Sequence, residues 1–260
     1  MSKILCVPDC HVEPDTNLNR FHLVGDYIVK EKPTHIILMG DFVSLSSLSH
    51  WDNDKKLTME GRRYTKDIQA ANVALDNIMA PYQSYVDKCN TYWKIGRDKV
   101  YRPTWIYLMG NHEQWFLRYV EQNPQMQGHV DIINDLALLR RGFQIVPYKR
   151  YIDVDDILFT HAPINAAGQP VGGKYALHRA LELTAKSIVF AHTHRWEQAA
   201  IHRHAGGNLI QALTCGCFFD ATPSYAEGSL HSYWKGLAVL RTYGKGNFDA
   251  EQISMSRLAS

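Results

Sequence analysis

Side chains that can bind metal ions occur in five short clusters of this 260-residue sequence. The clusters contain Asp9 and His11, then Asp41, then Asn111 and His112, then His161, and finally His192 and His194. Such a mixture of oxygen and imidazole ligands suits Mn, Fe, Zn or Ni better than Mg or Ca, and the lack of thiolates argues against a structural zinc site. Two ions about 3.5 to 4 Å apart can clamp a phosphoryl group and create a hydroxide nucleophile at neutral pH. We therefore expect hydrolysis of phosphate esters.

Each cluster directly follows a short apolar run with the composition of a buried strand. The runs cover residues 4–7, 35–39, 105–109, 157–160 and 187–191. Motifs such as Asp-x-His or His-x-His are common by chance when taken alone, but chance explains poorly why five clusters follow five strands in order. Helical patterns separate the runs, which favours a layered α/β fold whose ligands gather beyond the carboxyl ends of the strands.

The helical patterns cover residues 18–29 and 68–86, with shorter stretches after Glu113, around 130–139 and from 175 to 185. Pro81 should kink or split the second of these helices, because proline lacks the backbone N–H that a helix needs. Strands at 198–201, 209–213 and 237–243 are expected to supply a second sheet packed on the first. We expect a single domain over residues 1–260, with a helical insertion at about residues 45–100.

Local spacing also carries information about the site. Asp9 and His11 stand two residues apart just after a strand, so both side chains can reach one ion. Gly40 and Gly110 precede two of the clusters and would keep bulk away where the backbone turns sharply. The residues alone leave open whether His112 is a further ligand.

The order of the motifs resembles that of the calcineurin-like metallophosphoesterase superfamily, from residue 9 to residue 194. The motifs are Asp9-x-His11, Gly40-Asp41, Gly110-Asn111-His112-Glu113, His161 and His192-x-His194. The resemblance implies a four-layer sandwich of two mixed β-sheets flanked by helices, with a pair of metal ions at the sheet edge. In style the sequence also resembles phage-encoded members.

The resemblance further implies a role for each residue of the motifs. One ion would be bound by Asp9, His11 and His194 and the other by Asn111, His161 and His192, with Asp41 bridging the two. A metal-bound hydroxide would attack phosphorus in line, and His112 would protonate the leaving oxygen or hold it by a hydrogen bond. Manganese is the expected metal, with Fe, Zn and Ni as alternatives.

Two positions depart from the family pattern. Many members carry a second Asp three residues after the bridging one, where this chain has Ser44, which cannot supply the carboxylate charge. Leu45 stands where the Ser/Thr phosphatases have Arg, so we do not expect a protein phosphatase of that branch. Glu113 is expected to open the next helix, where a carboxylate favours the helix dipole.

The preferred function is that of a phosphodiesterase, and the main alternative is a DNA or RNA nuclease. A nuclease needs a basic groove or stacking aromatics, and the basic residues Lys94, Arg97, Lys99 and Arg102 could furnish such a groove. The basic stretch at 140–150 is a weaker candidate for a substrate rim. A non-catalytic scaffold would be expected to have lost ligands, whereas every ligand position is filled here.

The composition sets outer limits on partners and location. A formal charge of +2 argues against a surface coated in basic residues for nonspecific nucleic-acid binding. Because the sequence has no apolar run long enough for a membrane span and no secretory signal, we expect a cytoplasmic protein without membrane contact. The odd cysteine count favours packing thiols over disulfides. We expect no functional role for five further residues: His202 and His204 should be exposed to solvent, and His50, Trp51 and Trp93 should serve in packing.

Overall fold

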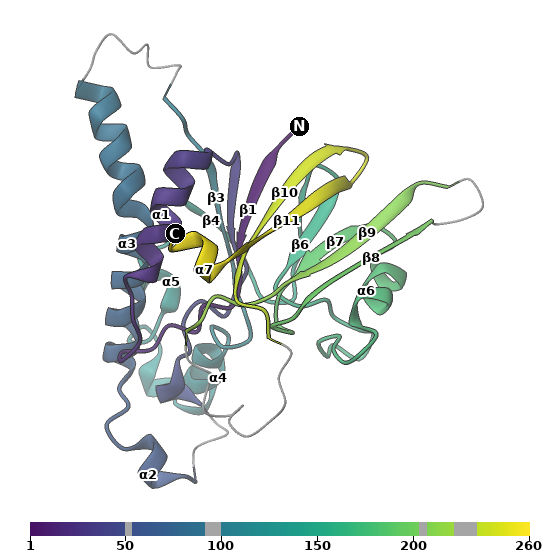
Figure 1. Cartoon of the computed structure of the whole chain (residues 1–260). Coiled ribbons are helices and arrows are strands. Elements are labelled where there is room, and N and C mark those ends of the chain that lie inside the picture. The colour runs from purple at the N-terminus through teal and green to yellow at the C-terminus, as the bar shows by residue number, and fades with distance from the viewer. Residues whose placement is uncertain (50–53, 92–99, 203–206, 221–232) are drawn as a thin grey trace.

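The predicted strands form the centres of two mixed sheets in the computed structural model, which describes residues 1–49, 54–91, 100–202, 207–220 and 233–260 (Figure 1). The first sheet has the order β11-β10-β1-β2-β3-β4. Its parallel strands are β1 (Lys3–Val7), β2 (His35–Leu38), β3 (Thr104–Leu108) and β4 (Phe143–Val146). Its antiparallel strands are β10 (Gly236–Gly244), which pairs with β1, and β11 (Asn247–Ser254).

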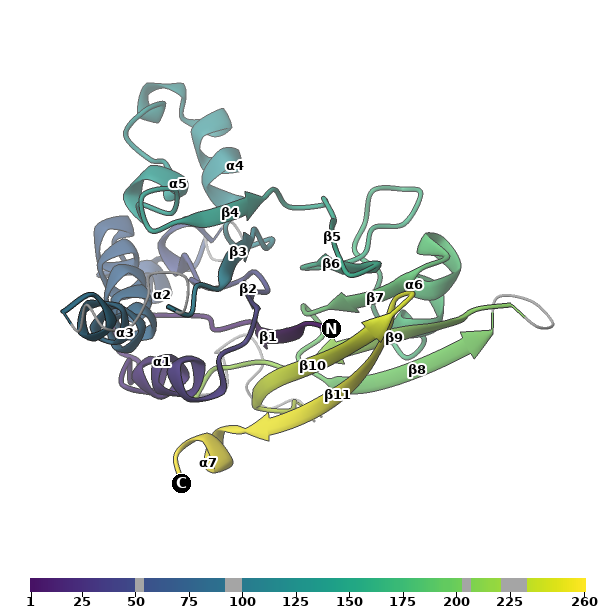
Figure 2. The same ribbon diagram turned by 90° about the horizontal axis from the view of Figure 1, so that it is seen from above.

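The second sheet has the order β5-β6-β7-β9-β8 and lies against the first (Figure 2). Its parallel strands are β6 (Ile157–Thr160), β7 (Ser187–Phe190) and β9 (Leu209–Cys215). Its antiparallel edge strands are β5 (Ile152–Val154) and β8 (Trp196–His202). Both sheets are therefore mixed, with parallel strands at the centre, as expected from the sequence.

Helices cover the outer faces of the two sheets (Figure 1). The first sheet is covered by α1 (Arg20–Glu31) and α3 (Tyr64–Thr91), and the second by α6 (Ala176–Thr184). The shorter helices are η1 (Ser46–Leu48), α2 (Lys56–Met59), α4 (Trp115–Gln122), η4 (Pro124–Met126), α5 (Ile132–Asp135) and α7 (Met255–Leu258). The result is the four-layer sandwich expected from the motifs.

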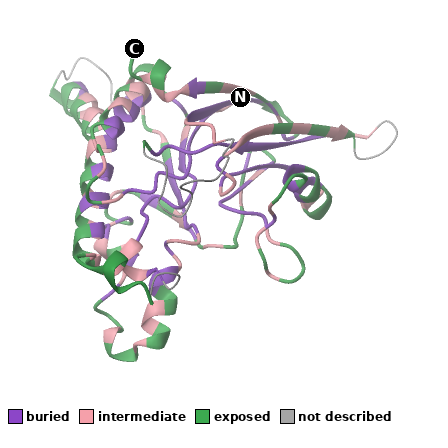
Figure 3. Cartoon of the chain, turned by 60° about the horizontal axis from the view of Figure 1, so that its bottom comes forward, coloured by how far each residue is buried: buried purple, intermediate pink, exposed green. Residues whose placement is uncertain are grey.

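The central strands are buried on both faces, as the purple segments in Figure 3 indicate. In β1, Leu5 faces the core shared with α1 and α3, whereas Ile4 faces the core between the sheets. In β7, Val189 belongs to the core between the sheets and Ile188 to the core under α6. This arrangement explains why the strands appear in the sequence as continuous apolar runs rather than as alternating patterns.

The sequence led us to expect all the predicted C-terminal strands in the second sheet, and this expectation was wrong for the last of them. Strands β8 and β9 do join that sheet, but β10 returns to pair with β1, and β11 follows it in the first sheet. Strands β4, β5 and β11 were not predicted, because each mixes polar with apolar residues and lies at or next to a sheet edge.

The helix α3 continues through Pro81 instead of splitting there. A side chain on Gly25 of α1 would lie only 2.7 Å from Cγ of Pro81 and 2.5 Å from the carbonyl oxygen of Ile78, so the two helices pack in direct contact at this glycine. A proline inside a helix costs about 3 kcal/mol, and the close packing of α1 against α3 contributes contacts at this point. In the described part of the chain, no helix has both the length and the apolar character to cross a bilayer.

Candidate metal centre

The predicted ligands all follow strands within four residues and come together where the carboxyl ends of the parallel strands of the two sheets meet. Asp9, Asp41 and Asn111 follow β1, β2 and β3 of the first sheet, and His161 and His192 follow β6 and β7 of the second. The site therefore lies between two sheet edges rather than at the edge of one. This placement buries most of the ligands while leaving Asn111 and His192 partly exposed.

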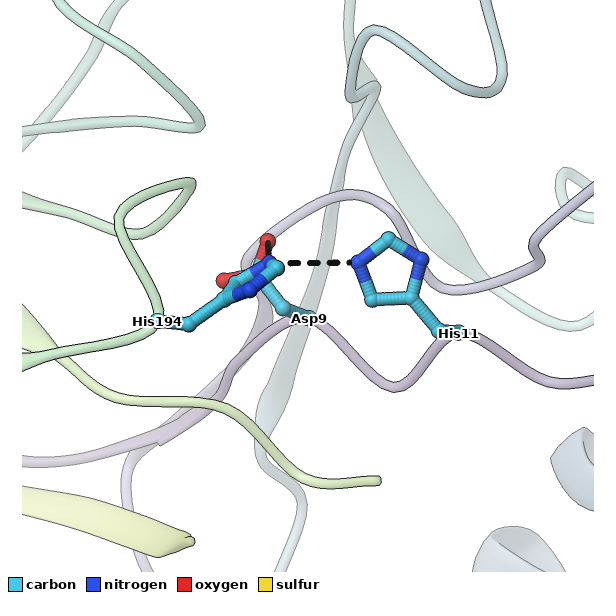
Figure 4. A group of neighbouring side chains, drawn as sticks. All are labelled: Asp9, His11 and His194. Carbon is cyan, nitrogen blue, oxygen red and sulfur yellow. Dashed lines mark hydrogen bonds and ion pairs between the residues drawn. The ribbon is translucent and has the colours of Figure 1, made fainter. Parts of the chain in front are cut away.

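Asp9, His11 and His194 form the first group of donors, with ligand atoms within 4.8 Å of one another (Figure 4). The two imidazole Nε2 atoms lie 3.2 Å apart, and Nε2 of His194 lies 3.5 Å from Oδ1 of Asp9. Two ring nitrogens and a carboxylate that converge in a buried place fit a divalent cation, which would satisfy all three at once.

Asp41, His161 and His192 form a second group, whose ligand atoms also lie within 4.8 Å of one another. Nε2 of His161 lies 3.4 Å from Oδ2 of Asp41 and 3.0 Å from Oδ1 of Asn111. Because the carbonyl of Met39 accepts a hydrogen bond of 2.9 Å from Nδ1 of His161, the other ring nitrogen is directed at this group. Asp41 also belongs to a third group with His11 and His112, so its carboxylate lies between the two sides of the site.

The electrostatics of the group favour a bound cation. Burial, followed by the charge of His112, lowers the pKa of His11 well below its usual range, and burial with the charge of His161 lowers that of His192 to about 4. Burial would also lower the pKa of His161, but the charge of Asp41 and its hydrogen bond raise it to about 10. His11 and His192 are thus neutral, which is the form of histidine that binds metals. In the metal-free protein, a proton on His161 balances the negative charge of Asp41.

The backbone at the ligands is strained. Five of them have positive φ angles, a region that non-glycine residues rarely enter: Asp9 at 27°, His11 at 43°, Asp41 at 46°, His192 at 66° and His194 at 57°. Each such conformation costs about 1 to 3 kcal/mol and persists only where the surroundings enforce it. Positive φ angles also occur in turns elsewhere in the chain, but their presence at five of the seven predicted ligands is what a functional site would show.

Both glycines singled out in the sequence are required by close approach. A side chain on Gly40, which has φ 91°, would lie 2.6 Å from Nδ1 of His161. A side chain on Gly110 would overlap Oδ1 and the backbone nitrogen of Asp41 and would lie 2.8 Å from Oε2 of Glu113. These contacts confirm the prediction that glycine keeps bulk away from the site.

Glu113 does not open a helix, contrary to expectation, since α4 begins two residues later and the side chain is fully buried. Its carboxylate accepts hydrogen bonds from five donors: the backbone N–H groups of Asp41 (2.9 Å), Phe42 (2.6 Å), Val43 (3.3 Å) and Gly110 (2.7 Å), and the hydroxyl of Tyr107 (3.1 Å). It ties the loop after β2 to the loop after β3. The local sequence favoured a role for Glu113 at the start of the next helix. The loop whose N–H groups need its carboxylate is distant in the sequence and becomes a neighbour only in the folded chain.

The carbonyl of Ser44, rather than its side chain, takes the place of the missing second carboxylate. This oxygen lies 2.7 Å from Nδ1 of His112, which donates to it, and the imidazole stacks on Trp115 with centroids 4.0 Å apart. Nε2 of His112 lies 3.9 Å from Oδ2 of Asp41 and so faces the site. The loop with Ser44 is itself anchored, because Ser47 donates to the buried Asp67 of α3 over 2.7 Å.

Of the basic residues proposed for a nucleic-acid groove, Arg102 alone belongs to the described part of the chain, and it does not lie at the site. Lys94, Arg97 and Lys99 lie outside the described residues. Arg102 is exposed and precedes β3, at the opposite end of the strand from Asn111. Among the other residues singled out, His50, Trp51, Trp93 and His204 lie outside the described residues, and His202 is exposed as predicted.

Two comparisons with known proteins found a similarity. A family model described as calcineurin-like phosphoesterase matches residues 2–196. The chain is also similar to a crystal structure of wild-type Vps29 complexed with zinc from Entamoeba histolytica, with 11% sequence identity, a TM-score of 0.42 and coverage of 97% of this chain and 99% of that chain. No curated protein sequence matches. Because the family model spans most of the chain, the protein belongs to the calcineurin-like phosphoesterase family and is a metal-dependent phosphoesterase.

Proposed function

We propose that the protein is a phosphodiesterase that works with two divalent metal ions, manganese foremost. The observation that carries the proposal is the position of Asp41 between two groups of donors, one with His11 and the other with His161. A carboxylate so placed can bridge two ions. When bound, the ions supply Lewis acidity that activates water and neutralises charge on the phosphoryl oxygens.

The chain's own residues divide into two ligand sets and a proton donor. Asp9, His11 and His194 hold one ion; Asn111, His161 and His192 hold the other. His112 donates a hydrogen bond or a proton from Nε2 to the leaving oxygen, since its Nδ1 proton is fixed by the carbonyl of Ser44. Trp115 stacks on the ring and fixes its orientation.

Aromatic rings around the ligands favour a diester over a free phosphate group. Phe219 and Tyr233 contact the ring of His194 edge to face, with centroids 5.2 and 4.9 Å away, and Tyr148 lies beside His161. Such walls suit organic groups esterified on both sides of a phosphate, because ring faces and edges pack against apolar or aromatic groups.

The test is hydrolysis of bis-p-nitrophenyl phosphate and p-nitrophenyl phosphate by the purified protein with added Mn²⁺. We expect preference for the diester, loss of turnover with a chelator, and a fall in kcat/KM of about 100-fold or more in Asp41→Asn. Asp26→Asn, which alters an exposed carboxylate on α1, serves as the matched control. A preference for the monoester would refute the assignment as a phosphodiesterase. A protein that binds no metal would instead favour the alternative of a non-catalytic scaffold.

A nuclease remains a second candidate because Lys149 and Arg150 are exposed just beyond β4, at the carboxyl edge of the first sheet. Basic side chains there could contact phosphates adjoining the scissile one. Cleavage of single-stranded DNA and RNA should then exceed cleavage of cyclic nucleotides and fall steeply with salt. Equal or better turnover of cyclic nucleotides would exclude this candidate.

A further inference from the structure

A polar side chain also follows the fourth parallel strand of the first sheet, although no sequence motif points to it. Strands β1, β2, β3 and β4 are parallel neighbours, so their carboxyl ends lie at the same edge. The first three are followed by candidate ligands. Tyr148 lies two residues beyond the end of β4, as Asp9 lies two residues beyond the end of β1.

The ring of Tyr148 lies against a candidate ligand. Its centroid is 6.1 Å from that of His161, with the planes tilted by 54°, and the residue is half-buried. The next residue, Lys149, has φ 67°, the same unusual backbone region as the ligands. The chain after β4 is therefore constrained like the other loops of the site.

Within the described residues the hydroxyl of Tyr148 has no hydrogen-bond partner, whereas its ring contacts the ring of His161, the ammonium of Lys149 and the core under α1 and α3. An ordinary tyrosine hydroxyl has a pKa of about 10, so it keeps its proton at neutral pH. A hydroxyl on a half-buried ring that lies beside a metal centre can donate to a bound group.

We propose that Tyr148 is a further catalytic residue, whose hydroxyl donates a hydrogen bond to a non-bridging phosphoryl oxygen of the substrate on the His161 side of the centre. The inference rests on the proposed function for the identity of that substrate. A neutral donor at this point would complement charge that builds on the phosphoryl oxygens without adding a fixed positive charge to a site that would already hold two cations. The alternative, that Tyr148 only packs on His161, requires the ring but not the hydroxyl.

Tyr148→Phe separates the two, because it removes the hydroxyl and leaves the ring. Tyr243→Phe is the matched control: Tyr243 is 49% exposed in β10, near the end that pairs with the start of β1, and thus remote from the site. With the Mn²⁺-loaded proteins, we expect kcat to fall about 10- to 100-fold in Tyr148→Phe, with KM changed less than about threefold and two ions still bound per chain. The control should match the wild type.

A binding measurement keeps this inference separate from the proposed function. Calorimetric titration of the Mn²⁺-loaded proteins with inorganic phosphate should give a Kd about tenfold weaker for Tyr148→Phe than for the wild type and the control. If the wild type does not hydrolyse the diester, the proposed function fails while this titration still decides the role of Tyr148. Phosphate affinity within about twofold of the wild type, or loss of an ion from the variant, would overturn the inference.

Discussion

Glu113→Gln tests whether one buried carboxylate holds the site together. The substitution keeps the size of the side chain but converts one acceptor oxygen into an NH2 group. Four of the five partners of Glu113 are backbone N–H groups, which can only donate, so the ionised carboxylate satisfies them best even though burial and the charge of Asp41 raise its pKa. Whichever oxygen is replaced, at least two buried donors then face another donor.

The magnitude follows from the number of partners on each oxygen. Oε2 accepts from Asp41 and Gly110, and Oε1 accepts from Phe42, Val43 and Tyr107. A buried donor without an acceptor costs about 1 to 3 kcal/mol, so the smaller loss amounts to about 2 to 6 kcal/mol. This is a large part of the stability of a typical domain, about 5 to 15 kcal/mol.

The measurement is urea unfolding of the chelated proteins, followed by tryptophan fluorescence, together with metal titration of the folded ones. Tyr107→Phe removes a single donor and should cost about 1 to 2 kcal/mol. Glu182→Gln, an exposed position on α6, should stay within about 0.5 kcal/mol of the wild type. In the less costly arrangement the new NH2 group takes the place of Oε2, so the amide of Asp41 loses its acceptor. We therefore also expect metal affinity to fall about 10- to 100-fold in Glu113→Gln.

The reasoning would be wrong if Glu113→Gln unfolded within about 1 kcal/mol of the wild type. Retained stability with weakened metal binding would mean that the loops rearrange without cost. Retained metal affinity in a destabilised protein would mean that Asp41 is positioned by other contacts, such as its bond to the amide of His112.

Three further predictions concern the same centre. Gly110→Ala should abolish metal binding, because the new methyl group overlaps Asp41, whereas Gly172→Ala, with open space around it, should bind metal normally in the same titration. Because the pKa of His161 is about 10 in the metal-free protein, a bound ion must displace its proton. Metal affinity should therefore rise by up to about tenfold per pH unit from pH 6 to 9, with about one proton released at pH 7 in calorimetry across buffers; affinity independent of pH would contradict this. His112→Asn should lower kcat while two ions stay bound; loss of an ion would make this residue a ligand.

Much of the centre could be predicted because its chemistry depends on residue type at strand ends. Buried parallel strands give continuous apolar runs, and a polar residue directly after such a run must emerge at the carboxyl edge. Asp9, Asp41 and His161 were identified on this basis. The strand before Tyr148 was not, because β4 mixes polar Gln144 with apolar residues at the edge of its sheet.

The sequence by itself determined which side chains could bind cations and that they would follow the ends of buried strands, since strand propensity and residue type are local properties. Only the tertiary structure decided how distant loops are held together. The carboxylate of Glu113 reaches amides about seventy residues away, and the carbonyl of Ser44 substitutes for a missing side chain at His112. A backbone oxygen carries no residue-specific signature, and a long-range hydrogen bond leaves no periodic pattern. Such contacts therefore become visible only when the chain is folded.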